Sequence, residues 1–199
     1  NCATPDPNMR DQLVLGIDLG TSGVRVAVMN EQCDLLFSKA VGYRRGLNDP
    51  QDWIVGCTQL VESIPSDYRT RVAAIAVDGT SGTLLACRDD GRPLGDALPY
   101  NLACPEHLTT IATLVPHGGP AASASGSVAR ALRLIQQHPS PLLLRHQADW
   151  ITGWLMQNWQ YGEEGNNLRL GWSLTANKWP DTFQHQPWQD ALPEIRPSG

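Results

Sequence analysis

The sequence predicts an α/β fold in which a mixed sheet is flanked by helices. Several short runs rich in Val, Ile and Leu are bounded by glycines, a pattern typical of strands buried on both faces of a sheet. A segment with helical spacing of its apolar residues follows the third run, and a fourth run follows that segment. Three strands, a helix and a further strand in this order indicate a mixed sheet with its helices outside.

The first part of the chain contains four of the expected strands and one helix. Residues 13–29 hold two strands on either side of a polar turn, and residues 35–41 hold the third strand. The helix begins at Pro50, because a proline in the first helical position loses no hydrogen bond, and it ends near Pro65. Residues 72–77 form the fourth strand.

The remaining elements are less clearly marked. Residues 83–87 form a fifth strand, and apolar spacing indicates helices over residues 127–137 and about 147–158. Residues 160–199 are rich in Trp, Asn, Pro and Gln, and the pattern predicts no particular element there.

The composition excludes two classes of partner. The 199 residues carry a formal net charge of −5, so neither nucleic acid nor an anionic membrane would attract the chain. No apolar run reaches the roughly 18 residues that a membrane-spanning helix needs. The five cysteines are scattered without Cys-x-x-Cys spacing, which is typical of free thiols in a reducing compartment. We therefore expect a cytoplasmic protein, or one of the plastid stroma if the source is a plant; the sequence leaves the oligomeric state open.

The polar turn between the first two strands is the most informative feature of the sequence. It contains one carboxylate, two glycines and two hydroxyl side chains, namely Asp18, Gly20, Thr21, Ser22 and Gly23. Glycines let backbone amides approach an anion closely, and the hydroxyls add further donors. A carboxylate would repel a bare phosphate, so its natural partner is the Mg²⁺ that accompanies a nucleoside triphosphate. The alternative is an ordinary hairpin whose Gly and Ser residues only satisfy the turn geometry.

Five segments, in the expected order, resemble the signatures of the FGGY carbohydrate kinases, a family of the actin-like ATPase superfamily. They are Gly-Ile-Asp-Leu-Gly-Thr-Ser-Gly-Val-Arg at 16–25, Ala-Val-Asp-Gly-Thr-Ser-Gly-Thr-Leu-Leu at 76–85, Leu-Pro-Tyr-Asn at 98–101, Gln-Ala-Asp-Trp-Ile at 147–151 and Asn-Asn-Leu-Arg-Leu-Gly-Trp at 166–172. The second segment and the Tyr-Asn-Leu-Ala-Cys-Pro run at 100–105 resemble the xylulokinase-like D-ribulose kinase branch of cyanobacteria and plants. The resemblance implies an actin-like ATPase (ribonuclease H-like) fold and an ATP-dependent kinase acting on a ketopentose of the ribulose or xylulose type.

The resemblance assigns roles to two polar loops. In the first loop Asp18 would hold Mg²⁺ near the transferred phosphate of ATP, and the backbone and hydroxyls of Gly20 to Gly23 would donate hydrogen bonds to phosphate oxygens. The sugar would be bound by residues that follow the fourth strand: Asp78, Gly79, Thr80, Ser81 and Asn101. For Asp78 a hydrogen-bonded turn is an equal alternative. We expect a strand pair to separate this sugar loop from the phosphate turn.

Four further features of the sequence have their own interpretations. Arg25 fits a salt bridge at the sheet edge at least as well as a phosphate contact. Leu102 stands where xylulokinases and glycerol kinases have an acidic residue, which favours the small ketose branch of the family. Asp149 is expected to cap a helix, and the five histidines are expected at the surface or in loops.

The resemblance also indicates what the chain lacks. In the family, the carboxylate base lies in a Gly-x-x-Asp segment, which does not occur between Trp172 and Gly199. We therefore expect no catalytic residue within this chain and the base beyond Gly199. Residues 1–12 would be a disordered or non-native leader, and residues 13–199 an N-terminal kinase domain that is incomplete and lacks its C-terminal domain. The alternative is a truncated, non-catalytic binding or regulatory module with the same fold.

Overall fold

The computed structural model describes residues 12–115 and 119–198, which form two compact units. Unit 1 comprises the residues up to Leu47 together with Gln51–Gly79, and unit 2 comprises Asn48–Pro50 and the residues from Thr80 onward. The leader expected at residues 1–12 lies, apart from Gln12, outside the described residues. Within the described part of the chain, no helix is long and apolar enough to cross a bilayer.

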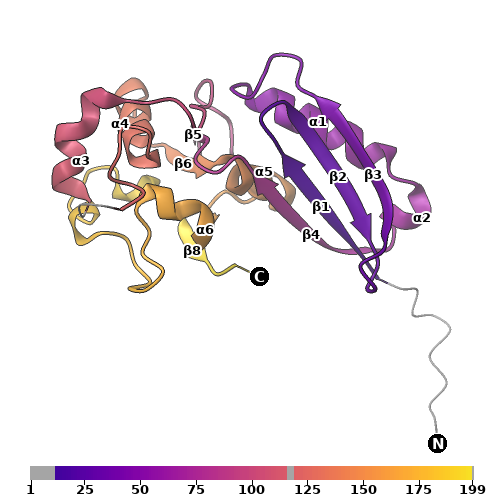
Figure 1. Cartoon of the computed structure of the whole chain (residues 1–199). Helices are drawn as coiled ribbons and strands as arrows, with labels where there is room; N and C mark the ends of the chain where they lie inside the picture. Colours follow the sequence, from indigo (N-terminus) through magenta and orange to yellow (C-terminus); the bar gives the residue numbers. More distant parts are fainter. Residues whose placement is uncertain (1–11, 116–118, 199) are drawn as a thin grey trace, which may run out of the picture. The chain divides into compact units, whose positions relative to one another are not determined.

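Unit 1 is a four-stranded mixed sheet with a long helix along one face (Figure 1). Its elements are β1 (Leu13–Leu19), β2 (Gly23–Met29), β3 (Leu35–Gly42), α1 (Pro50–Ser63), α2 (Ser66–Arg69) and β4 (Val72–Gly79). The strand order is β3-β2-β1-β4, in which β1, β2 and β3 are antiparallel and β4 runs parallel to β1. The four strands, the helix start at Pro50 and the mixed sheet expected from the sequence are confirmed.

The central strands β1 and β2 of unit 1 are buried on one face only, and β3 and β4 contain no fully buried residue. Burial alternates along β1 and β2, so that Leu15 and Val26 are buried while Val14 is 45% exposed. Helix α1 packs on the buried face, where a Cβ added to Gly56 would lie 2.8 Å from Cγ2 of Val24. The expectation of strands buried on both faces was therefore wrong. Helix α1 shields one side, and the side chains that point to the other side stay exposed.

Strand β4 lies directly beside β1, which brings two predicted site residues together. The parallel register pairs Asp18 with Asp78 and Leu19 with Gly79 at the carboxyl ends of both strands. The expectation that a strand pair separates the two loops was therefore wrong. Strands β2 and β3 form a meander on one side of β1. The chain then crosses over through α1, and β4 joins the sheet on the other side of β1.

Unit 2 contains short strands and mostly short helices. Its elements are β5 (Leu84–Cys87), α3 (Leu108–Leu114), α4 (Ser127–Gln137), β6 (Leu143–His146), α5 (Gln147–Met156), β7 (Tyr161–Glu163), α6 (Glu164–Asn167) and β8 (Glu194–Arg196), with single 3₁₀ turns at Pro105–His107, Leu168–Leu170, Asp181–Phe183 and Gln189–Ala191. Strands β5 and β6 pair antiparallel, and β7 pairs with β8 in parallel. The bounds of α4 match the sequence pattern. Helix α5 ends two residues earlier than expected, where Gln157 adopts a left-handed backbone conformation with φ of 53°.

The core of unit 2 forms around β5, β6 and α4. All four residues of β5 and all four of β6 are buried, and Val128, Ala131 and Leu134 of α4 are buried in the same cluster as Leu84 and Leu144. The segment that was unassigned from the sequence contributes Phe183 and Trp188, whose rings pack edge to face at 5.0 Å. Buried residues of this core bind the loop that follows β4 and the loop at residues 99–104.

Candidate functional site

The turn between β1 and β2 is held by its backbone, which leaves its side chains exposed. The amide of Gly20 donates to the carbonyl of Gly23 at 2.9 Å, and the hydroxyl of Tyr43 donates to the carbonyl of Gly20 at 3.1 Å. The amide of Tyr43 donates to the carbonyl of Ser22 at 2.9 Å. Thr21 and Ser22 are exposed, and the structure gives their hydroxyls no hydrogen-bond partner among the described residues. The two hydroxyls are therefore free to bind a ligand.

The two glycines of this turn differ in the space that a side chain would find. A Cβ at Gly23 would lie 2.2 Å from the carbonyl oxygen of Val41 and 2.9 Å from Cα of Gly42, both on the neighbouring strand β3. A Cβ at Gly20 would come no nearer than 3.6 Å to another atom, which is an ordinary contact. Gly23 is therefore required by the close approach of β3, and Gly20 remains available for close approach to a ligand.

We expect Gly23→Ala to destabilise unit 1 and Gly20→Ala to leave it intact. The added methyl at Gly23 collides with backbone, so the strands must move apart, at a cost of about 1–3 kcal/mol in the free energy of unfolding. The methyl of the Gly20 variant makes only an ordinary contact and should change this free energy by less than about 1 kcal/mol. Urea denaturation of both variants measures the difference, and equal stabilities would contradict the role assigned to Gly23.

Asp18 lies at the end of β1 with its carboxylate accessible. Its side chain is 54% exposed, and Oδ2 lies 3.7 Å from Nη1 of Arg25, directly across from it on β2. Exposed ion pairs of this kind contribute little to stability, so Arg25 can yield Asp18 to a cation. Asp18, Gly20 and Ser22 border a surface depression of about 260 Å³. The interpretation of Arg25 as a salt-bridge partner agrees with this geometry.

Asp78 occupies the matching position on β4. Its carboxylate accepts a hydrogen bond from the amide of Gly79 at 2.8 Å, which is the local turn considered as the alternative to sugar binding. The register with Asp18 places two exposed carboxylates on neighbouring strands. Either carboxylate alone could hold a cation, and the local hydrogen bond leaves one Asp78 oxygen without a partner among the described residues.

Thr80 is committed to the interior of unit 2. Its hydroxyl donates to Oε1 of Gln147 at 2.7 Å and lies 2.7 Å from the hydroxyl of Thr83. Its amide donates to the same Gln147 oxygen at 2.9 Å. Gln147 is fully buried at the start of α5, so these bonds fix the loop after β4 to the core. Sequence reasoning missed Gln147, since its partner lies 67 positions away.

Ser81 and Asn101 present polar groups to solvent. Both residues are exposed, and the structure gives their side chains no hydrogen-bond partner in the described ranges. Their loops are joined because the hydroxyl of Thr83 accepts from the amide of Tyr100 at 3.2 Å, and Leu84 and Leu98 exchange backbone hydrogen bonds at 3.0 and 2.8 Å. These two residues could contact a polyol without first breaking an internal bond.

The Asn-Asn-Leu-Arg-Leu-Gly segment is anchored by a buried carboxylate. Asp149 lies within the first turn of α5 and accepts from the side-chain amides of Asn166 at 3.0 Å and Asn167 at 2.9 Å. Burial raises the pKa of Asp149 to about 6. The expectation that Asp149 caps the helix was wrong, since His146 holds the cap position and Asp149 bonds to a distant segment.

The expectation that every histidine lies at the surface or in a loop was also wrong. His146 is buried, and its Nε2 lies 3.0 Å from the hydroxyl of Ser127. Burial, assisted by the nearby cation of Arg130, lowers the pKa of His146 to about 3. His146 is therefore neutral at physiological pH and serves the core.

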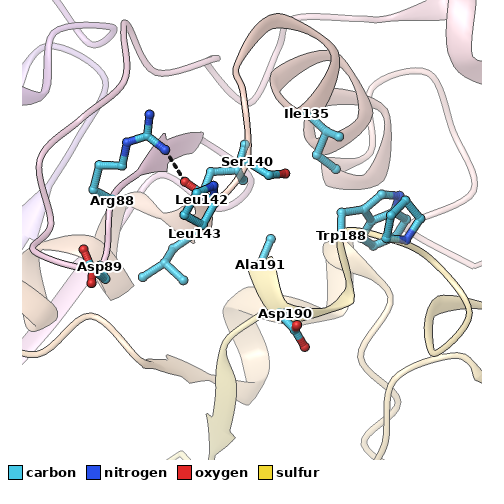
Figure 2. A pocket seen from close by; sticks show the side chains of 11 residues that line it. Arg88, Asp89, Ile135, Ser140, Leu142, Leu143, Trp188, Asp190 and Ala191 are labelled. Carbon is cyan, nitrogen blue, oxygen red and sulfur yellow. Dashed lines mark hydrogen bonds between the residues drawn. The ribbon is translucent and has the colours of Figure 1, made fainter.

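A separate pocket of about 310 Å³ lies in unit 2 and contains none of the predicted site residues (Figure 2). Ile135, Leu142 and Trp188 give it apolar walls, and Asp89 and Asp190 lie at its edge. Arg88 donates from Nη1 to the carbonyl of Pro141, as the dashed line in Figure 2 shows. This bond directs the guanidinium to the backbone of the pocket wall.

Comparisons with known proteins agree with the fold and find a partial sequence match to a sugar kinase. The chain is 30% identical over 98 residues to the xylulose kinase of Lactococcus lactis, a match that covers 44% of this chain and 20% of the relative. No family model matches the chain. The structure is similar to the xylulose kinase of Rhodospirillum rubrum, with a TM-score of 0.78, 16% identity, and coverage of 93% of this chain and 43% of that one.

A second solved structure is similar to this chain to about the same degree. The glycerol kinase of Plasmodium falciparum, crystallised with ADP, matches with a TM-score of 0.75 and 15% identity over 94% of this chain and 43% of that one. The chain thus spans less than half the length of these proteins. The actin-like ATPase fold with a mixed sheet flanked by helices is confirmed.

Proposed function

We propose that this chain is the N-terminal part of an ATP-dependent sugar kinase of the FGGY family. The protein would transfer the γ-phosphoryl group of ATP to a hydroxyl of a ketopentose such as ribulose or xylulose. The observation that carries the proposal is Asp18, an exposed carboxylate at the end of β1 beside a turn whose hydroxyls have no internal partner in the described chain. The 30% identity to a xylulose kinase over 98 residues supports the same function.

The residues of the phosphate turn fit ATP with Mg²⁺. Asp18 supplies a hard oxygen ligand, and the hydroxyls of Thr21 and Ser22 together with the backbone at Gly20 supply donors for phosphate oxygens. When bound, Mg²⁺ would neutralise the negative charge that builds up on the transferred phosphoryl group. The donors of the chain stay fixed during the reaction, because Tyr43 holds the turn from both sides through Gly20 and Ser22.

The sugar would be bound through Ser81 and Asn101. A hydroxyl and a carboxamide together offer donors and acceptors, which a polyol requires at each carbon. Asp78 would add an acceptor through its free oxygen, and Gly79 and Thr80 would hold the loop in place. Leu102 stands where the xylulokinase and glycerol kinase branches have an acidic residue. This difference supports assignment of the chain to the D-ribulose kinase branch. The remaining catalytic group, the carboxylate base, would lie outside this chain.

The direct test of this function is a steady-state assay of the full-length protein. ATP-dependent phosphorylation should be fastest with D-ribulose or D-xylulose, and glycerol serves as the control polyol. Omission of Mg²⁺ should abolish the activity, and its return should restore it. Absence of ATP-dependent phosphorylation with all three polyols would contradict the proposed function and favour the non-catalytic module.

We expect Ser81→Ala to weaken the use of sugar without changing the slow hydrolysis of ATP in its absence. The loss of one hydroxyl contact to a neutral sugar group should cost about 0.5–1.5 kcal/mol, or up to about 3 kcal/mol if a buried partner is left unpaired. The effect should appear as a raised KM or a lowered kcat/KM for the ketopentose. A parallel fall of both activities would assign Ser81 to the phosphate site or to the fold.

A further inference from the structure

Arg130 is a completely buried cation whose polar partners are backbone and hydroxyl groups. It lies in the first turns of α4 with a side-chain exposure of 0%. Its guanidinium donates to four carbonyl oxygens and one hydroxyl oxygen in the described chain, those of Gly82 at 3.0 Å, Tyr100 at 3.1 Å, Leu102 at 2.9 Å, Ser125 at 3.0 Å and the Ser127 hydroxyl at 3.5 Å. Burial lowers its pKa to about 10, so the side chain remains charged at neutral pH.

The carbonyls bound by Arg130 belong to the two loops that present the candidate sugar ligands. Gly82 directly follows Ser81, and Tyr100 and Leu102 stand on either side of Asn101. Nε binds the first loop and Nη1 binds the second loop at two points. One rigid, planar group therefore fixes the backbone next to both exposed side chains.

Gly82 allows this close approach. It has a φ of +92°, and a Cβ at this position would lie 3.0 Å from Nη2 of Arg130. The guanidinium thus packs against the loop backbone in the space that any other side chain would occupy. The absence of a side chain at Gly82 therefore lets the guanidinium lie against the loop backbone that it binds.

A lysine at position 130 cannot reproduce the hydrogen bonds of the Arg130 guanidinium. The guanidinium presents five donors in a fixed plane, whereas an ammonium group has three donors around a single nitrogen. A lysine side chain in place of Arg130 would keep the charge but could not reach Gly82, Tyr100 and Leu102 from one position. The exchange therefore separates the geometry of the contact from its charge.

We propose that Arg130 is a positioning residue that sets the separation of Ser81 and Asn101 and thereby the affinity for the sugar. The inference rests on the proposed function, because it concerns the sugar site of that kinase. Arg130 does not contact the substrate itself, since it is fully buried beneath the two loops. Its loss should change sugar binding more than it changes the use of ATP.

The test compares Arg130→Lys with Arg133→Lys in the full-length protein. Arg133 lies on the same helix and pairs with Glu106 at the surface, so its exchange is a matched control. We expect Arg130→Lys to raise the KM for D-ribulose or D-xylulose at least tenfold, with the KM for ATP changed less than threefold. Amide hydrogen exchange should accelerate in residues 79–84 and 98–104. The control should show neither effect.

The outcomes distinguish this inference from the function on which it rests. Unchanged sugar KM and unchanged exchange in Arg130→Lys would overturn the inference, as would an equal rise in both KM values. If Arg130→Lys does not fold, Arg130→Gln, which keeps a planar donor group but has only two N–H donors, decides by the same measurements. A wild-type protein that phosphorylates no sugar would contradict the proposed function, and hydrogen exchange alone would then show whether Arg130 holds the two loops.

Discussion

Asp18→Ala should abolish the proposed phosphoryl transfer by the full-length protein while leaving its fold intact. Asp18 is exposed at the end of β1, and its weak ion pair with Arg25 contributes little to stability. A carboxylate that holds a metal ion near the transferred phosphate commonly contributes several kcal/mol to the transition state. Because each ~1.4 kcal/mol is a factor of ten in rate, we expect kcat to fall by at least about a hundredfold.

Asp78→Ala is the matched comparison for this variant. Asp78 is also an exposed carboxylate, in register with Asp18 on the neighbouring strand. If the two residues divide their roles as proposed, Asp78→Ala should mainly raise the sugar KM and reduce kcat far less than Asp18→Ala. Circular dichroism and thermal unfolding check that both variants fold. Retention of more than about a tenth of the wild-type kcat in Asp18→Ala would refute the assignment.

Gly91→Ala should be among the most destabilising single exchanges in unit 2. Gly91 has a φ of +79°, and a Cβ there would lie 2.1 Å from Cε2 of Trp159. Its carbonyl accepts from the indole of Trp150 at 2.9 Å, and the indole of Trp159 donates to the carbonyl of Trp150 at 3.0 Å. The methyl would therefore disturb two buried tryptophans at once.

The expected loss combines two costs. A left-handed backbone costs a non-glycine residue about 1–2 kcal/mol, and overpacking of a tight contact adds about 1–3 kcal/mol. Gly46→Ala is the control, because Gly46 has a φ of +110° but no atom within 4 Å of an added Cβ. The stability of Gly46→Ala should therefore fall by the cost of the left-handed backbone alone. Urea denaturation of both variants measures the difference, and equal losses would show that Trp159 can move aside at little cost.

The sequence by itself determined the elements whose signals are local. The apolar runs predicted β1 to β4, Pro50 marked the start of α1, and the apolar spacing gave α4 its correct bounds. The Asp18 to Gly23 turn was recognisable because its residues are adjacent in the chain. The candidate sugar ligands Ser81 and Asn101 were identified in the same way, from short segments that resemble a known family.

Tertiary structure alone decided the contacts between distant residues. It placed β4 beside β1, so that Asp18 and Asp78 are neighbours, and left one face of that sheet exposed. It committed Thr80 to Gln147, 67 positions away. Arg130 has a weak sequence signal, since it precedes the buried Leu134 by four positions and so lies on the same helix face.

The need for glycine at positions 91 and 23 was likewise decided by the tertiary structure. Only the packing of Trp159 against Gly91 explains why an alanine would not fit there. Gly23 belongs to a turn that the sequence predicts to bind phosphate, yet the carbonyl of Val41 on β3 is what requires a glycine there. Periodicity and turn propensity report a residue's near neighbours in the chain. Which distant groups meet at a site depends on strand register and core packing, which no short segment encodes.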